Sequence, residues 1–191
     1  VQLADSITKL GYRLFYNDTA LKEVNIPVSW KECPEYNRYY YGHMFEGCSS
    51  LTQVTIPEGF GDLPAFAFQG CANLERIFLP AGIIRIGEYA FDGCTALIAL
   101  ELPDTVEVIG ECAFQNCRGL KELTFPAGVY TLGDHALKNC SGLTSLTLST
   151  DLETIGHCAL EGCSNLTALI IPNKVSSIGY RAFYNCSRLS S

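Results

Sequence analysis

Apolar residues return along this chain in one pattern that repeats every 23 positions. Within one repeat, residues 100–102 alternate apolar and polar side chains, which is typical of a short strand with one buried face. Pro103 follows directly and ends the strand, because proline has no N–H to donate to a ladder. A fixed period in the twenties predicts a solenoid of stacked rungs. This rung carries eight positions that we expect to point inward: Leu97, Leu100, Leu102, Val106, Ile109, Ala113, Phe114 and Cys117.

Consecutive strands are joined by long connections, so the pattern predicts a parallel sheet. The segment after each glycine of the repeat, such as 110–115, predicts one helical turn that is too short to be stable alone. The predicted fold is therefore an α/β solenoid, a leucine-rich array of about eight rungs that follow the 23-position period, each with one short parallel strand and one helical turn.

Each predicted helical turn ends at a position that holds only glycine or asparagine. These two residue types best tolerate a left-handed backbone, so we expect positive φ throughout this column. Its members are Asn17, Gly47, Gly70, Gly93, Asn116, Asn139, Gly162 and Asn185.

Seven cysteines occupy one equivalent position of the repeat and keep its period without interruption: Cys48, Cys71, Cys94, Cys117, Cys140, Cys163 and Cys186. Asp18 takes this place in a further copy, before the insertion that precedes Cys48. Equivalent rungs give no pair of these thiols a reason to prefer each other, and their number is odd. We therefore expect reduced, buried cysteines that act as small apolar residues.

No linker interrupts the repeat, which predicts a single solenoid over residues 1–191 that begins and ends in mid-repeat. An insertion at 28–41 lengthens one rung, so that Pro27 and Pro57 stand further apart than the regular period. The terminal rungs lack the polar caps that solenoids need. We therefore expect either a piece of a longer protein or end-to-end self-association of copies.

The net charge of the chain limits the classes of partner that we expect. Twenty acidic residues against 13 basic ones give a net charge of −7, which argues against nucleic acid as a ligand. No stretch approaches the length of apolar sequence that a membrane-spanning helix needs, and the chain shows no signal peptide.

Candidate chemistry is sparse. The sequence contains no nucleophile elbow, zinc-protease motif or P-loop, so we expect no catalytic residues. Cys112, His135 and Cys158 stand at one position of three neighbouring rungs, and both residue types are zinc ligands. The same position accepts phenylalanine, tyrosine and arginine elsewhere, which indicates a variable, partly exposed column. We expect no metal, no cofactor and no enzymatic activity.

The segments IGEYAFDGCTALIALELP (86–103) and IGECAFQNCRGLKELTFP (109–126) resemble the Treponema-type leucine-rich repeat of BspA-like surface proteins. The resemblance covers the chain apart from the insertion. Asp18 in place of cysteine, and Leu137 and Leu160 in place of phenylalanine, depart from it. It implies a right-handed solenoid with a concave parallel sheet. It also implies a bacterial or protist protein, on the cell surface or secreted, that binds other proteins or cells without catalytic residues.

Two surfaces are candidates for binding. The insertion gathers aromatic rings and an arginine, which dominate binding hot spots: Trp30, Tyr36, Arg38 and Tyr39. The outward positions of the predicted strands form the second surface, and its candidates are Arg76, Phe78, Glu101 and Glu122.

These observations favour a non-catalytic protein-interaction module, a segment of an adhesin-like protein whose ligand is a protein or a cell surface. One alternative is a carbohydrate-binding surface on which the tyrosines of the insertion act as stacking platforms. Another is a structural spacer within a longer repeat protein. An enzyme is the least favoured reading, because the Cys112–His135–Cys158 column is its one sequence feature.

If the insertion binds a partner, replacing Trp30 and Tyr39 with alanine should weaken that partner by about tenfold or more, because such rings carry much of the energy of an interface. The melting temperature should change little, since the rings would be exposed. Binding and thermal unfolding of the variant and the parent chain check both expectations. Unfolding without loss of binding would show that the rings are structural and would favour the strand surface.

Overall fold

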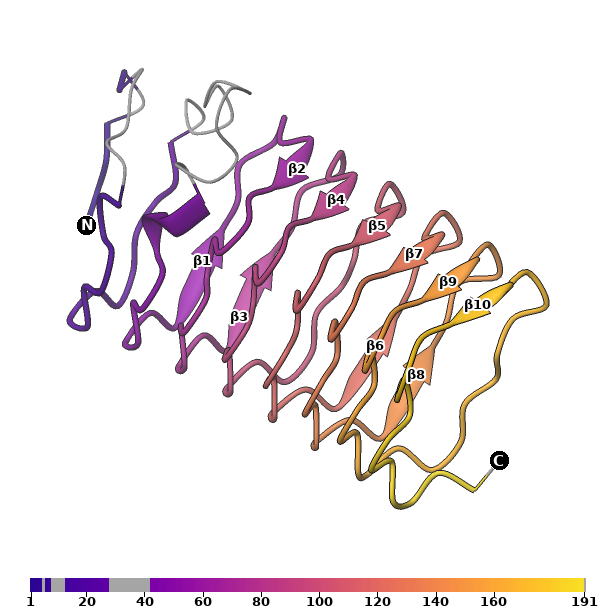
Figure 1. The fold of residues 1–191 in the computed structure, drawn as a ribbon. Coiled ribbons are helices and arrows are strands. Elements are labelled where there is room, and N and C mark those ends of the chain that lie inside the picture. The colour runs from indigo at the N-terminus through magenta and orange to yellow at the C-terminus, as the bar shows by residue number, and fades with distance from the viewer. Residues whose placement is uncertain (5, 8–12, 28–41, 191) are drawn as a thin grey trace.

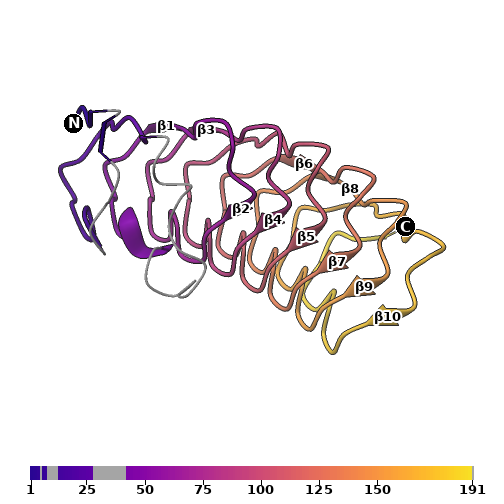
Figure 2. The ribbon, with the colours of Figure 1, turned by 90° about the horizontal axis from the view of Figure 1, so that it is seen from above.

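The computed structural model describes residues 1–4, 6–7, 13–27 and 42–190 of this chain. The chain winds into a parallel β-solenoid whose rungs stack side by side from the N-terminal to the C-terminal end (Figures 1 and 2). Strands pair one sequence period apart, as in Thr131 opposite Thr154, so the sequence period is the rung period. The insertion at 28–41 lies outside the described residues.

The strands of the rungs form two separate ladders (Figure 1). One ladder joins six parallel two-residue strands: β2 (Asp62–Leu63), β4 (Arg85–Ile86), β5 (Val108–Ile109), β7 (Thr131–Leu132), β9 (Thr154–Ile155) and β10 (Ser177–Ile178). The other is built from three-residue strands: β1 (Gln53–Thr55) paired with β3 (Arg76–Phe78), and β6 (Glu122–Thr124) paired with β8 (Ser145–Thr147). The prediction of a single strand per rung was therefore wrong, and the count of about eight rungs stays a prediction.

The strand predicted at 100–102 is absent. The equivalent strands of neighbouring rungs predict it at 99–101, and there Ala99 forms one isolated bridge to Glu122. Residues 168–170, in the same position of a later rung, form no strand either. Both segments begin with alanine, Ala99 and Ala168, which is a weaker strand former than the β-branched and aromatic residues.

The predicted helical turn is not confirmed. Cys112 has a φ of 53°, which no right-handed helix accommodates. Its N–H donates to the carbonyl of Asp134 at 2.9 Å, and the Phe114 N–H donates to Ala136 at 2.8 Å. These bonds run to the next rung, whereas a helix would keep them within the segment. Among the described residues, the helical element is the short 3-10 helix η3 (Gly42–Met44).

The expectation of positive φ is confirmed at all eight positions of the glycine and asparagine column, with values from 56° at Asn17 to 77° at Gly93. A second left-handed column, four positions earlier, was not foreseen. It holds Arg13, Phe66, Tyr89, Cys112, His135, Cys158 and Arg181, with φ between 53° and 61°. In every copy except that of His43, whose φ is −81°, two left-handed residues let the chain reverse direction over a short stretch while its N–H groups bond the adjacent rung.

Gly110 marks a position where rungs approach closely. A Cβ atom added there would lie 2.8 Å from the carbonyl oxygen of Ile86 in the preceding rung. The Gly110 N–H donates to that same oxygen at 2.9 Å. The glycine thus permits a backbone contact that any side chain would push apart.

The core runs through the stack as columns of equivalent side chains. Phe15, Phe45, Phe68, Phe91 and Phe114 stack with ring centroids 5.4 to 5.7 Å apart. Of the eight predicted inward positions, seven are buried, as the sequence predicted. Leu102 is half-buried, as is Leu79 at the same position of the preceding rung.

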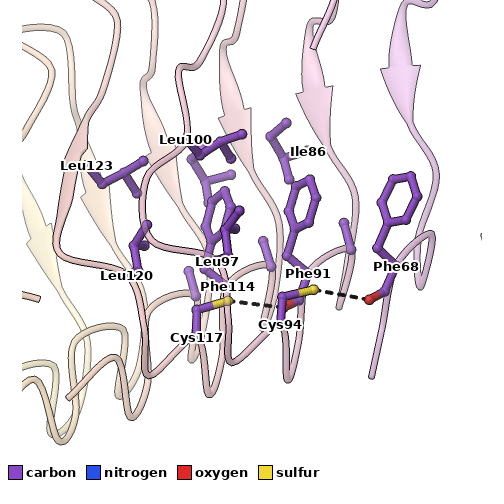
Figure 3. Packing of buried hydrophobic residues seen from close by; sticks show 14 of the residues in the cluster. Phe68, Ile86, Phe91, Cys94, Leu97, Leu100, Phe114, Cys117, Leu120 and Leu123 are labelled. Carbon is purple, nitrogen blue, oxygen red and sulfur yellow. Dashed lines mark hydrogen bonds between the residues drawn. The ribbon is translucent and has the colours of Figure 1, made fainter. Parts of the chain in front are cut away.

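The cysteine column forms a ladder of hydrogen bonds (Figure 3). Each Sγ–H donates to the backbone carbonyl of the core residue 26 positions earlier, or 33 positions for Cys48, at 2.9 to 3.3 Å. Cys117, for example, donates to Phe91 at 3.1 Å. All seven are free thiols; six are buried and Cys186 is half-buried. Each of these carbonyls also accepts a backbone N–H, as Phe91 does from Cys94 at 3.0 Å, so the thiol adds a second hydrogen bond that joins adjacent rungs.

Burial raises the pKa of the Cys94, Cys117 and Cys140 thiols well above the ordinary value of 9.0. The folded state therefore holds these protons at a pH where the unfolded chain has released them. Stability contributed by the protonated thiols is present below about pH 9 and is lost as the pH rises further. Burial also raises the pKa of Cys48 to about 11 and of Cys163 to about 12, so the loss continues through that range.

We expect the free energy of unfolding to fall steeply above about pH 9, by up to about 1.4 kcal/mol per pH unit for each fully buried thiol. Urea unfolding across this range measures the slope. Cys117→Ala should be less stable at neutral pH because it leaves a cavity. Its free energy of unfolding should nevertheless fall less steeply with pH than that of the parent chain, because one buried thiol is missing. Equal slopes in the two proteins would contradict this account and assign the loss to lysine and tyrosine.

Candidate binding face on the β1–β3 and β6–β8 side

The strands β1, β3, β6 and β8 bury their middle residue and expose the two that flank it. Period-two alternation therefore places one row of side chains in the core and two rows on an open face. Arg76, Phe78, Glu101 and Glu122 all lie on this face and are exposed, as predicted. The remaining predicted site residues, Trp30, Tyr36, Arg38 and Tyr39, lie outside the described residues. A binding role for any of the eight stays a prediction.

Three of the predicted residues come together around one open depression of about 240 Å³. Arg76, Phe78 and Glu101 line it from two adjacent rungs, over the buried side chains of Ile77 and Leu100. The Phe78 side chain is 57% exposed, which is high for a phenylalanine. A large exposed ring above an apolar floor is the kind of anchor that protein interfaces use.

An adjoining depression of about 420 Å³ lies one rung further along. Its apolar floor includes Leu100, Leu102 and Leu123. Three carboxylates stand around it: Glu101, Asp104 and Glu122. Ala99, Leu100 and Glu101 line both depressions.

The depressions flank the break in the strand ladder. Within residues 42–190, no backbone hydrogen bond joins β3 to residues 99–101, although the equivalent strands β1 and β3 are paired throughout. Ala99 also presents a methyl group where neighbouring rungs present Arg76 and Glu122. A missing strand and a small side chain together leave this part of the face hollow.

Sequence reasoning missed Asp104 and Leu102 as parts of the site. Asp104 follows Pro103, so it was a turn residue with no apparent ligand role, and Leu102 was assigned to the core. The alanine at position 99, unlike the larger residues in the rungs on either side, was the available signal for a hollow.

The column of Cys112, His135 and Cys158 offers no metal site. No group of three His, Cys, Asp or Glu side chains in the described part of the chain is placed to hold a metal ion. Burial raises the pKa of the Cys112 thiol, and a hydrogen bond with Glu161 raises that of Cys158, so neither thiol is activated as a nucleophile. Earlier in the same column, His43, Phe66 and Tyr89 form a stack with centroids 4.5 and 5.1 Å apart.

No helix among the described residues is long and apolar enough to cross a membrane.

The stacked parallel rungs, with their constant sequence period and ladder of leucines, define a leucine-rich-repeat solenoid. The family model of the BspA-type leucine-rich repeat region matches residues 1–83, 32–102 and 85–191. The chain belongs to this family. No curated protein matches the chain at a significant level.

Solved structures agree with this assignment. A leucine-rich repeat protein from Bacteroides ovatus is 34% identical over 77% of this chain, with a TM-score of 0.74. The T. pallidum leucine-rich repeat protein TpLRR is 35% identical over 78% of this chain, also with a TM-score of 0.74. The chain spans 38% of the first structure and 69% of the second. The pneumococcal vaccine antigen PcpA, 22% identical over 69% of this chain and 37% of its own with a TM-score of 0.55, shares the fold.

Phe78 and Phe91 provide a matched test of which rings are structural. Phe91 is fully buried in the ring stack, so Phe91→Ala should cost about 3–5 kcal/mol of stability. Phe78→Ala should stay within about 0.5 kcal/mol, because the ring is largely in solvent. Chemical denaturation measures both. A cost for Phe78 comparable to that for Phe91 would place its ring in the core and remove it from the candidate binding face.

Proposed function

We propose that this chain is a non-catalytic protein-interaction module of a cell-surface or secreted, adhesin-like protein. The observation that carries the proposal is the open face on which Phe78, Arg76 and Glu101 surround an apolar hollow. An exposed phenylalanine with an arginine beside it matches the residues that anchor protein interfaces.

The fold supports this assignment. A solenoid presents a row of equivalent strands, so one side of the molecule offers an extended surface for a macromolecule. The hollows are open and shallow, unlike the enclosed pockets that bury most of a small ligand. The family resemblance to BspA-like surface proteins supports a position on the cell surface or outside the cell.

The proposal is tested by measuring binding of the purified chain to a panel of extracellular-matrix and cell-surface proteins by surface plasmon resonance. We expect a partner whose affinity falls about tenfold or more when Phe78 and Arg76 are replaced with alanine, as hot-spot residues require. Tyr130→Ala is the matched control, since Tyr130 is 40% exposed beside β7, in the other ladder.

Two results would contradict the proposal. One is the absence of any saturable partner in the panel. The other is a partner that the Tyr130 variant weakens as much as the Phe78 and Arg76 variant, because binding would then not use this face.

A further inference from the structure

We propose that the acidic groove on this face docks an extended polypeptide segment that carries basic side chains. The acidic groove is the depression with Leu100, Leu102 and Leu123 in its floor and with Glu101, Asp104 and Glu122 around it. This inference rests on the proposed function and specifies the chemistry of the partner.

The floor of the groove suits the stem of a lysine or arginine. Leu100 and Leu123 are buried beneath it, and Leu102 is half-buried and partly open to the groove. Long basic side chains lay their methylene groups on apolar surface while the charged head stays at the polar edge. An acidic segment would not match the carboxylates around the groove, and a purely apolar segment would leave them without a partner.

Unlike Asp151 and Glu161, the three carboxylates of the groove have no cationic partner within residues 42–190. Asp151 pairs with Lys174 at 2.5 Å, and Glu161 pairs with Lys138 at 3.3 Å. Within residues 42–190, no side chain is bonded or ion-paired to Glu101, Asp104 or Glu122, although Arg76 lies on the same face. The groove therefore presents uncompensated negative charge to a partner.

The arrangement favours a cation on a flexible stem over a bare metal ion. No three acidic, histidine or cysteine side chains of the described part of the chain converge closely enough to hold a metal. A guanidinium or ammonium group needs no such convergence, since it can bond one carboxylate at a time from an adaptable stem.

The neighbouring hollow beside Phe78 explains why the segment should be extended. The two depressions share Ala99, Leu100 and Glu101, so they lie next to each other on the face. Alternate side chains of an extended chain point to the same side. A basic residue in the acidic groove thus brings the residue two positions away towards Phe78, where an apolar side chain fits.

The probe is a short synthetic peptide in which threonine alternates with valine, lysine, valine and arginine, titrated into isotope-labelled chain and followed by NMR. We expect chemical-shift changes concentrated at residues 99–104 and 122–126 and an affinity that falls as salt is raised. The double variant Glu101→Gln, Glu122→Gln should weaken binding about three- to tenfold, as loss of two exposed charge pairs implies. Glu107→Gln, at an exposed position beside β5, should leave it unchanged.

Peptides with glutamate or threonine in place of lysine and arginine complete the test. Equal binding of the threonine peptide would assign the groove to an apolar occupant and overturn the inference. Absence of shifts in the groove, or an equal effect of Glu107→Gln, would overturn it as well. A protein partner that depends on Phe78 but not on salt, Glu101 or Glu122 would overturn this inference alone and leave the proposed function standing.

Discussion

Hydrogen bonding between rungs is the constraint on which this structure depends. In strands and turns alike, N–H groups reach carbonyls of an adjacent rung, as between Phe114 and Ala136 at 2.8 Å or Gly110 and Ile86 at 2.9 Å. A rung alone could satisfy neither these groups nor its two apolar faces. Every rung must therefore bring its bonding groups level with those of its neighbours, and the period is constant from Cys48 to Cys186. This requirement explains why the sequence repeats with a constant period.

The same constraint explains why the core columns are nearly invariant along the chain. A thiol such as Cys94 fits because it fills a small space and also donates to the Phe68 carbonyl of the rung before. Glycine at position 110 fits because a Cβ atom would meet the Ile86 oxygen. The adjacent rung restricts which residue type fits at each such position. A substitution in one rung therefore affects the packing of the rungs on both sides.

The positions that the sequence predicted well are those that repeat for a single physical reason. The repeat predicted buried side chains at Phe91 and Phe114 and a left-handed backbone at Gly93 and Asn116. The structure confirms both predictions. The second ladder was missed because a two-residue strand such as Thr131–Leu132 is too short to display alternation. The helical turn was predicted in error because the left-handed position at Cys112 accepts many residue types. The composition of that column therefore gave no sign of its backbone conformation.

The candidate binding face follows from where the repeat is free to vary. Apolar residues at 97, 100 and 102 keep the pattern of the core, so periodicity alone gives no sign that the strand at 99–101 is lost. Outward positions carry no packing requirement, and Ala99 between Arg76 and Glu122 leaves a hollow without disturbing the stack. The second ladder, continuous through β4, β5 and β7, holds these rungs together across the break. Because one ladder maintains the stack, the other can open at 99–101, where the two hollows of the face lie.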